Sequence, residues 1–248
     1  MPDSPPIVAV VGATASGKTE LSLDLAERLG GEIVNTDAMQ QYIGMDIGTA
    51  KLPVAERRGV PHHLLDVLDV TESASVAVFQ EQAREVIAGL RGRGVTPVLV
   101  GGSALYTRAV LDRFDFPGTD PAVRVRLEGE LAQSGIAALH QRLVEVDPVA
   151  AERIGPANVR RVVRALEVVE ITGRPFSASL PTLDYFYDNA VQVGVRISRP
   201  ILDDRIALRV QRMWDAGLVE EVRRLEAIGN TASTCVFVLG ENGTCRPE

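Results

Sequence analysis

A glycine-rich segment near the start of the sequence has the residue types and spacing that bind phosphate groups. Residues 12–19 read GATASGKT and match the pattern G-x-x-x-x-G-K-[ST]. In such a loop successive backbone N–H groups point inward at phosphate oxygens, and the following helix adds its positive N-terminal dipole. Lys18 would supply a positive charge, and the Thr19 hydroxyl could bind Mg²⁺. We predict a pyrophosphate-binding P-loop formed by Gly12, Ala13, Thr14, Ala15, Ser16, Gly17, Lys18 and Thr19.

The P-loop does not by itself identify the ligand as ATP, although many nucleotide-binding and ATP-binding proteins share it. In P-loop ATPases an apolar strand commonly ends in an aspartate that helps to hold the metal. Here the apolar residues 97–100 are followed by Gly101, Gly102 and Ser103. This sequence argues against an ATP hydrolase and leaves room for another diphosphate ligand.

The elements around the P-loop have the order of a parallel α/β sheet. Short apolar runs at residues 7–11, 32–35 and 95–100 predict buried strands. Helices are predicted between and after them, over residues 18–29, from an N-cap at Ser75 to about residue 93, and over residues 103–111. Alternation of strands and helices with short glycine-bearing turns is typical of a P-loop NTPase-like α/β core with a parallel sheet.

The pattern changes near Phe114 and predicts an inserted all-helical domain. Residues 114–189 carry helical segments separated by Gly135, Asp147-Pro148 and Gly155-Pro156. A strand over residues 191–198 and helices over 202–216 and 218–228 then resume the core. We therefore predict a discontinuous core of residues 1–113 and 190–229 and a helical insertion of residues 114–189. The remaining residues, 230–248, are expected to form a poorly ordered tail that adds little to the core.

Charge and composition limit the classes of partner. The net charge is −7, so any nucleic-acid contact must be local. Residues 151–175 hold five arginines and three glutamates, an excess of positive charge in the helical insertion. The two cysteines, Cys235 and Cys245, have no C-x-x-C spacing, and no apolar stretch approaches the length of a membrane span. We expect a cytoplasmic protein with no membrane partner.

Several further blocks together with the P-loop resemble the tRNA dimethylallyltransferases of the bacterial type. The resemblance includes Asp37, the block GMDIGTAK at residues 44–51, and the block GGSALY at residues 101–106. It also includes EVDP at residues 145–148 and RALE at residues 164–167, and it runs from about Ile7 to Ile228. The GMDIGTAK block is far more specific than the P-loop. The match does not extend into the tail, which is atypical for the family.

The resemblance implies an enzyme that transfers a dimethylallyl group from dimethylallyl diphosphate to a tRNA adenosine. The diphosphate would lie in the P-loop over Lys18, Thr19 and Mg²⁺. The acceptor would be the exocyclic amine of the adenosine 3′ of the anticodon, presented by the tRNA anticodon stem-loop. Because the allyl cation is delocalised, the main catalytic task would be to stabilise the departing pyrophosphate. We expect the enzyme to act as a monomer.

The resemblance also assigns roles to individual residues. Asp37 would be the general base, since a carboxylate is ionised at neutral pH and can accept the proton of the amine. Ser103 stands where the family usually has threonine and would contact the adenosine. Arg205 and Arg209, four residues apart on one helix, would bind the diphosphate. The tRNA contacts would come from Asp37, Ala38, Met39, Gln40, Ser103, Arg124, Arg160, Arg161, Val162, Val163 and Arg164.

Two alternative functions and two structural expectations complete the predictions. A small-molecule kinase would also combine a P-loop with lid arginines and would transfer phosphate from ATP without tRNA. A remnant that binds a nucleotide or a diphosphate without turnover is the second alternative. We expect structural roles for His62 and His63, whose side chains point apart in an extended segment, and core positions for Met213 and Trp214.

Overall fold

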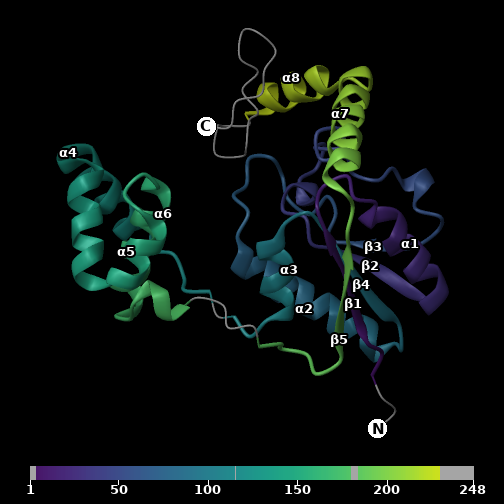
Figure 1. Ribbon diagram of the computed structural model, residues 1–248, viewed down its shortest axis with the longest axis horizontal. Helices are drawn as coiled ribbons and strands as arrows, with labels where there is room; N and C mark the ends of the chain where they lie inside the picture. Colours follow the sequence, from purple (N-terminus) through teal and green to yellow (C-terminus); the bar gives the residue numbers. More distant parts are fainter. Residues whose placement is uncertain (1–3, 115, 180–183, 230–248) are drawn as a thin grey trace. The chain divides into compact units, whose positions relative to one another are not determined.

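The computed structural model describes residues 4–114, 116–179 and 184–229 (Figure 1). It divides the chain into two compact units. The first, called here the sheet unit, combines Met1–Leu111 with Tyr187–Glu248, and the second, the helical unit, is Asp112–Phe186. The tail predicted for residues 230–248, with Cys235 and Cys245, lies outside the described residues.

The sheet unit is built on a five-stranded sheet with the strand order β3-β2-β4-β1-β5. All neighbouring strands pair in parallel, which confirms the predicted parallel sheet. The carboxyl ends of β1, β2 and β4 therefore meet at one edge, where α/β proteins bind their ligands. The strands are β1 (Ile7–Gly12), β2 (Gly31–Asn35), β3 (His62–His63), β4 (Thr96–Val100) and β5 (Ala190–Val195).

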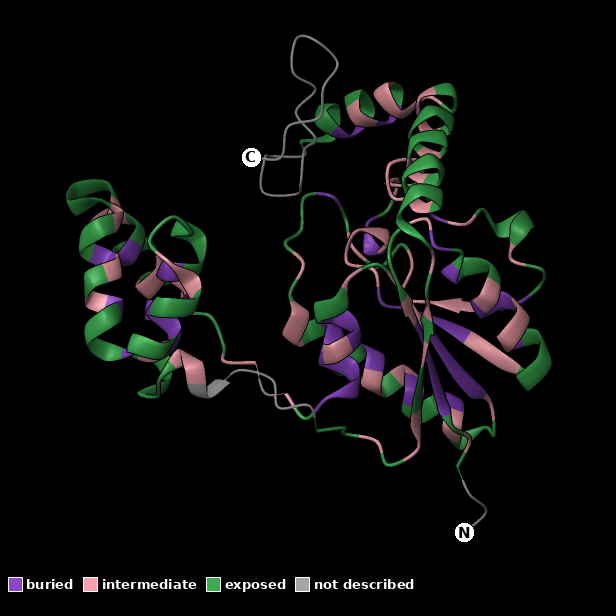
Figure 2. Ribbon diagram, in the orientation of Figure 1, coloured by how far each residue is buried: buried purple, intermediate pink, exposed green. Residues whose placement is uncertain are grey.

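Helices cover both faces of this sheet (Figures 1 and 2). Helices α2 (Val76–Gly92) and α3 (Ala104–Leu111) pack on one face, where Phe79 and Val110 join Ile7 and Leu99 in a buried cluster. Helix α1 (Lys18–Leu29) packs on the other face through Leu23 and Ala26. The predicted caps are also present, because Ser75 accepts a hydrogen bond from Val78 N and Gly30 ends α1 in a left-handed conformation.

Close backbone approach at the carboxyl edge explains the glycines after β4. A Cβ on Gly101 would lie 2.2 Å from the backbone carbon of Thr36. A Cβ on Gly102 would lie 2.7 Å from Oδ2 of Asp37. At Gly101 any side chain would collide with the backbone after β2, and at Gly102 it would displace the carboxylate of Asp37. The segments that follow β2 and β4 are thereby held against each other, which places Asp37 beside the loop after β4.

Helices α7 (Arg199–Asp215) and α8 (Leu218–Ile228) follow β5 and complete the described part of the sheet unit. The expected core positions of Met213 and Trp214 are wrong, because both are only partly buried and α7 has no buried residue. Their helical spacing indicated a face of the helix but could not show what covers that face. Among the described residues, no helix is long and apolar enough to cross a lipid bilayer.

In its described residues the helical unit contains α-helices that are interrupted or end at the three predicted breakpoints, and one further helix ends at Gly173. Helix α4 (Pro121–Val146) is interrupted at Gly135, which has φ 73° and ψ 170°. Helix α5 (Pro148–Ile154) ends at Gly155, and α6 (Val159–Thr172) ends at Gly173. The short 3₁₀ helix η3 (Phe176–Ser179) follows α6. Buried side chains from the three α-helices form one core, which includes Leu127, Leu143, Ala150, Val162 and Leu166.

A fully buried carboxylate joins the helices of this unit. Glu167 Oε2 lies 2.7 Å from one guanidinium nitrogen of Arg124 and 2.7 Å from one of Arg164, and its Oε1 accepts a hydrogen bond from Asp120 N at 3.3 Å. Burial opposes ionisation of Glu167, but the two arginines outweigh it and lower the pKa of this carboxyl. The ionised form of Glu167 therefore stabilises the fold of the helical unit.

We predict that Glu167→Gln weakens the helical unit by roughly 2 kcal/mol, the scale of hydrogen bonds to charged groups. Amide hydrogen exchange in α6 should then lose protection by a factor of roughly 30. Because the folded pKa is lowered from 4.5, the stabilisation is complete above that pH and is lost as the pH falls through the lowered folded value. Glu152→Gln, which changes an exposed glutamate of α5, is the control and should lose far less protection.

Candidate active site

The P-loop follows β1 and leads into α1, as the sequence predicts. Ala15 has φ 56° and Gly17 has φ 99°, and such left-handed residues turn backbone N–H groups toward a common centre. The ammonium group of Lys18 donates hydrogen bonds to Gly12 O at 2.9 Å and to Ala13 O at 2.6 Å. The lysine charge is thus held within the loop, where a phosphate group would meet both it and the N-terminus of α1.

One buried polar atom of the P-loop lacks a hydrogen-bond partner within the described part of the protein. The hydroxyl oxygen of Ser16 is buried and has no hydrogen-bond partner among the described residues. Buried hydroxyl groups are almost always hydrogen-bonded. A ligand oxygen in the loop would satisfy this group, so the loop is suited to an oxygen-rich anion such as a diphosphate.

Asp37 is held by backbone donors from two segments. Its Oδ1 accepts a hydrogen bond from Met39 N at 2.9 Å, and its Oδ2 accepts one from Gly102 N at 3.0 Å. The side chain of Asn35, at the end of β2, accepts from Asp37 N at 2.9 Å and donates to Leu64 O at 2.9 Å. These bonds fix both the backbone and the carboxylate of Asp37 at the carboxyl edge of the sheet.

Ser103 supports the same segment from the start of α3. Its hydroxyl oxygen accepts a hydrogen bond from Ala38 N at 3.1 Å. The side chain is absent from the wall of the cavity described below. Ser103 therefore stabilises the backbone next to Asp37, and its predicted contact with an adenosine stays a prediction.

Two arginines of α7 reach the P-loop, as the resemblance implies. Arg209 donates to the Thr14 hydroxyl at 3.1 Å and to Thr49 O at 3.4 Å, and Arg205 donates to Ser16 O at 3.5 Å. Burial lowers the pKa of Lys18, and the charge of Arg209 lowers it further, while Asp37 opposes both effects. Burial also lowers the pKa of Arg209. Repulsion among these cations would be relieved by a bound anion.

These groups share one cavity of about 500 Å³ in the sheet unit, a volume typical of small-molecule sites. Of the predicted site residues, the cavity brings together Asp37, Gln40, Arg205, Arg209 and residues 14–19 of the P-loop. Gly12, Ala13, Ala38 and Met39 lie outside its wall, although Gly12 and Ala13 hold Lys18. The wall also includes residues that the sequence did not assign to the site: Ser22, Ile33, Asn35, Thr49, Ala50, Leu52, His62, Leu65, Val100, Gly101, Gly102, Leu208 and Arg212.

The two histidines have separate partners. His62 Nδ1 lies 2.8 Å from Val60 O, and His63 Nε2 lies 2.6 Å from a carboxylate oxygen of Glu32. Burial lowers the pKa of His62. In the described part of the chain no cluster of three histidine, cysteine, aspartate or glutamate side chains could hold a metal ion. His63 thus has a structural partner, whereas His62 also contributes to the cavity wall.

The remaining predicted site residues lie in the helical unit. Arg160 and Arg161 are exposed at the start of α6, whereas Val162 and Val163 are buried in the core of the unit. Arg164 donates to Pro117 O at 2.7 Å as well as to Glu167. Arg124 is also paired with Glu167. The exposed Arg160 and Arg161 are therefore the members of this set with side chains available to a partner.

Comparison with known proteins identifies the family of the chain. Residues 40–241 match the family model of the IPP transferases. The chain is 72% identical to a tRNA dimethylallyltransferase of Nocardioides sp. over 228 residues, which cover 92% of this chain and 74% of the relative. It is 61% identical to a tRNA dimethylallyltransferase of Streptomyces coelicolor, covering 92% of this chain and 73% of that protein.

Solved structures similar to this chain also belong to tRNA prenyltransferases. The crystal structure of the tRNA isopentenylpyrophosphate transferase of Bacillus halodurans superposes with a TM-score of 0.63 at 42% identity, covering 96% of this chain and 75% of that one. A eukaryotic dimethylallyltransferase, studied crystallographically while acting on tRNA, has a TM-score of 0.77 at 27% identity, covering 91% of this chain and 56% of its own. With a family model that covers most of its length and relatives of such high identity, the chain belongs to the IPP transferase family.

Proposed function

We propose that this chain transfers the dimethylallyl group of dimethylallyl diphosphate to the exocyclic amine of the adenosine 3′ of the anticodon in tRNA. The observation that carries the proposal is one cavity that holds the P-loop, Asp37 and the α7 arginines together. A diphosphate-binding end and a fixed carboxylate are what an alkyl transfer from a diphosphate to an amine requires. A cytoplasmic location is part of the proposal because the acceptor is tRNA.

The residues of the cavity have two tasks in the reaction, to stabilise the leaving group and to accept a proton. The bond between the allylic carbon and the diphosphate oxygen breaks, and the bond between that carbon and the adenosine nitrogen forms. Lys18, Arg205, Arg209 and the P-loop amides stabilise the charge of the departing pyrophosphate. Asp37 accepts the proton that the alkylated amine loses. The hydrogen bonds from Met39 N and Gly102 N keep its carboxylate in place for this step.

The residues present fit a magnesium ion bound mainly through the substrate. Thr19 is exposed at the cavity wall, and the described residues offer no carboxylate cluster to enclose a metal. Mg²⁺ usually keeps several waters and binds through phosphate oxygens and one or two protein ligands. Thr19 would supply the protein ligand, and the metal would neutralise part of the diphosphate charge. Transfer should accordingly stop when divalent metal is chelated.

The helical unit is proposed to contact tRNA through exposed arginines. Arg160 and Arg161 begin α6 next to its N-cap, Asn158, where two exposed positive charges and the N-terminal helix dipole all favour phosphate. Arg124 and Arg164 contribute less because Glu167 already neutralises part of their charge. The buried Val162 and Val163 hold α6 in the core instead of contacting RNA through their side chains.

We predict that the double variant Arg160→Glu/Arg161→Glu weakens tRNA binding and flattens its salt dependence by about one unit of slope per lost phosphate contact. Pyrophosphate affinity should not change. The control is Arg28→Glu/Arg93→Glu, which reverses the same number of charges on the sheet unit, in the last turn of α1 and at the C-cap of α2. An unaltered salt slope in the first variant, measured by titrating tRNA at several salt concentrations, would place the RNA elsewhere.

One assay tests the proposed function. The protein is incubated with labelled dimethylallyl diphosphate, Mg²⁺ and unmodified tRNA, and label is then measured in the tRNA. We expect label at the adenosine 3′ of the anticodon and none in a tRNA with guanosine at that position. Phosphate transfer from ATP without tRNA would support the alternative of a small-molecule kinase. Pyrophosphate binding without any transfer would indicate the inactive remnant.

A further inference from the structure

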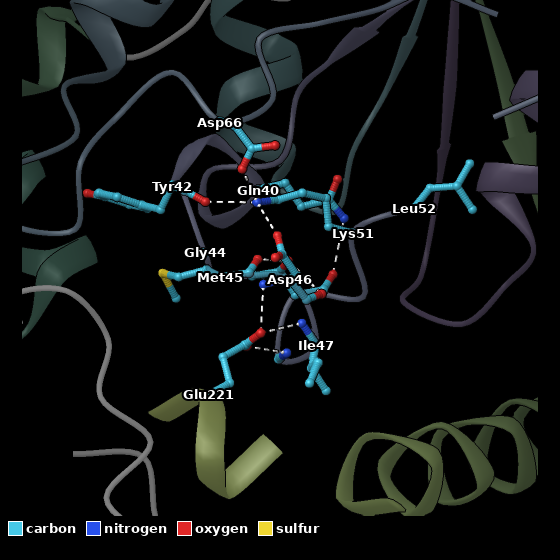
Figure 3. Close-up of polar contacts among 12 residues, drawn as sticks. Gln40, Tyr42, Gly44, Met45, Asp46, Ile47, Lys51, Leu52, Asp66 and Glu221 are labelled. Atoms are coloured by element: carbon cyan, nitrogen blue, oxygen red, sulfur yellow. Dashed lines mark hydrogen bonds and ion pairs between the residues drawn. The ribbon is translucent and has the colours of Figure 1, made fainter. Parts of the chain in front are cut away.

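A buried glutamate far from the P-loop in sequence is bound by three consecutive backbone N–H groups (Figure 3). Glu221 of α8 accepts hydrogen bonds from Asp46 N at 2.9 Å and Ile47 N at 2.7 Å through Oε2, and from Gly48 N at 2.9 Å through Oε1. Its exposed fraction is 6%. Hydrogen bonds to an ionised carboxylate are about twice as strong as those between neutral groups. Residues 44–52, called here the connecting loop, are therefore fastened to α8.

The other side of the connecting loop is fastened by a buried lysine (Figure 3). The ammonium group of Lys51 donates to Tyr42 O at 2.8 Å and pairs with Asp46 at 2.8 Å and Asp66 at 2.5 Å. Its side chain is 4% exposed. Asp46 is thus bound through its carboxylate by Lys51 and through its backbone N–H by Glu221, which leaves the loop little freedom to move.

The connecting loop joins the two ends of the cavity through one carbonyl oxygen. Thr49 O accepts hydrogen bonds from Arg209 at 3.4 Å and from the Gln40 side chain at 3.1 Å. Arg209 belongs to the diphosphate end of the cavity, and Gln40 lies three residues after Asp37. Thr49, Ala50 and Leu52 also form part of the cavity wall. The position of the loop thus decides where Arg209 and Gln40 are held.

We propose that Glu221 is a positioning residue that sets the affinity of the site for the diphosphate through the connecting loop and Arg209. The inference rests on the proposed function, because it assigns the diphosphate to the P-loop end of the cavity. Glu221 does not line the cavity. It acts only by holding the connecting loop, whose Thr49 O accepts hydrogen bonds from both Arg209 and Gln40. A glutamate that merely anchored α8 would affect stability alone.

The test compares Glu221→Gln with Glu220→Gln, the neighbouring glutamate whose side chain is 73% exposed. Glutamine keeps the shape but turns an NH₂ group toward the loop N–H groups, so the loop should loosen. We expect the dissociation constant for inorganic pyrophosphate and the KM for dimethylallyl diphosphate to rise about tenfold, with kcat changing by less than threefold. Glu221→Asp should recover part of the affinity, and Glu220→Gln should match the wild type.

A double-mutant cycle with Arg209→Gln separates positioning from a purely structural role. Because Glu221 acts through Arg209, Glu221→Gln should add little to the loss of pyrophosphate affinity that Arg209→Gln already causes. The titrations are made well below the melting temperature of each variant, so that loss of folded protein does not enter. Independent, additive losses would overturn the proposal, and so would unchanged affinity with a lowered melting temperature. If wild type binds pyrophosphate but transfers no label to tRNA, the proposed function fails while this inference remains testable by binding.

Discussion

Replacement of Asp37 is expected to lower the single-turnover rate of dimethylallyl transfer by roughly 10²–10⁴, the usual scale for a lost acid–base group. The carboxylate is fixed between Met39 N and Gly102 N and faces the cavity that holds the P-loop. Asp37→Asn is preferable to Asp37→Ala as the first variant, because it keeps an oxygen that can accept one of those two hydrogen bonds. Both variants should bind pyrophosphate nearly as well as the wild type.

The measurement is single-turnover transfer of label to tRNA with enzyme in excess, which excludes effects on product release. The control is Asp24→Asn, a change of the same chemistry in a surface residue of α1 that pairs with Arg58. It should leave the rate unchanged. Turnover of either Asp37 variant within tenfold of wild type would show that another group accepts the proton.

The features predicted correctly from the sequence are those encoded by neighbouring residues. The P-loop, the N-cap at Ser75 and the break at Gly135 each depend on a few consecutive residue types, and the structure contains all three. The parallel order of the main strands also follows from the alternation of short apolar runs with helices. Strand β3 was missed because it is only two residues long and has no periodicity of its own.

The features that the sequence could not predict depend on residues far apart in the chain. Glu221 and the N–H groups that it binds are 173–175 positions apart, and nothing around Glu221 distinguishes it from its exposed neighbour Glu220. The ion pair between Arg124 and the buried Glu167 could not be predicted for the same reason, because the two residues are 43 positions apart. Residues 160–164 were treated as one contiguous segment, but one turn of helix directs Arg160 and Arg161 outward and Val162 and Val163 into the core.

Removal of the Lys18 charge is expected to affect both binding and rate, unlike the Asp37 variants. The ammonium group lies beside the P-loop carbonyls of Gly12 and Ala13. Under the proposed function it would contact the diphosphate before the allylic bond breaks and the pyrophosphate afterwards. Loss of one preorganised donor to a developing charge typically lowers rates by about 10²–10³. Lys18→Met keeps an unbranched side chain that is one atom shorter and removes the charge together with its hydrogen-bond donors.

The expected result for Lys18→Met is therefore a weaker affinity for inorganic pyrophosphate, measured by calorimetric titration, together with a fall of about 10²–10³ in kcat/KM for dimethylallyl diphosphate. Lys18→Arg is the matched control. It keeps the charge, but a planar guanidinium is larger than an ammonium group and cannot take the same place between the carbonyl oxygens of Gly12 and Ala13, so it should recover binding only in part. If Lys18→Met bound pyrophosphate as tightly as wild type, the backbone amides of the loop and the α7 arginines would hold the ligand without the lysine. The lysine would then act only on the charge that develops as the allylic bond breaks.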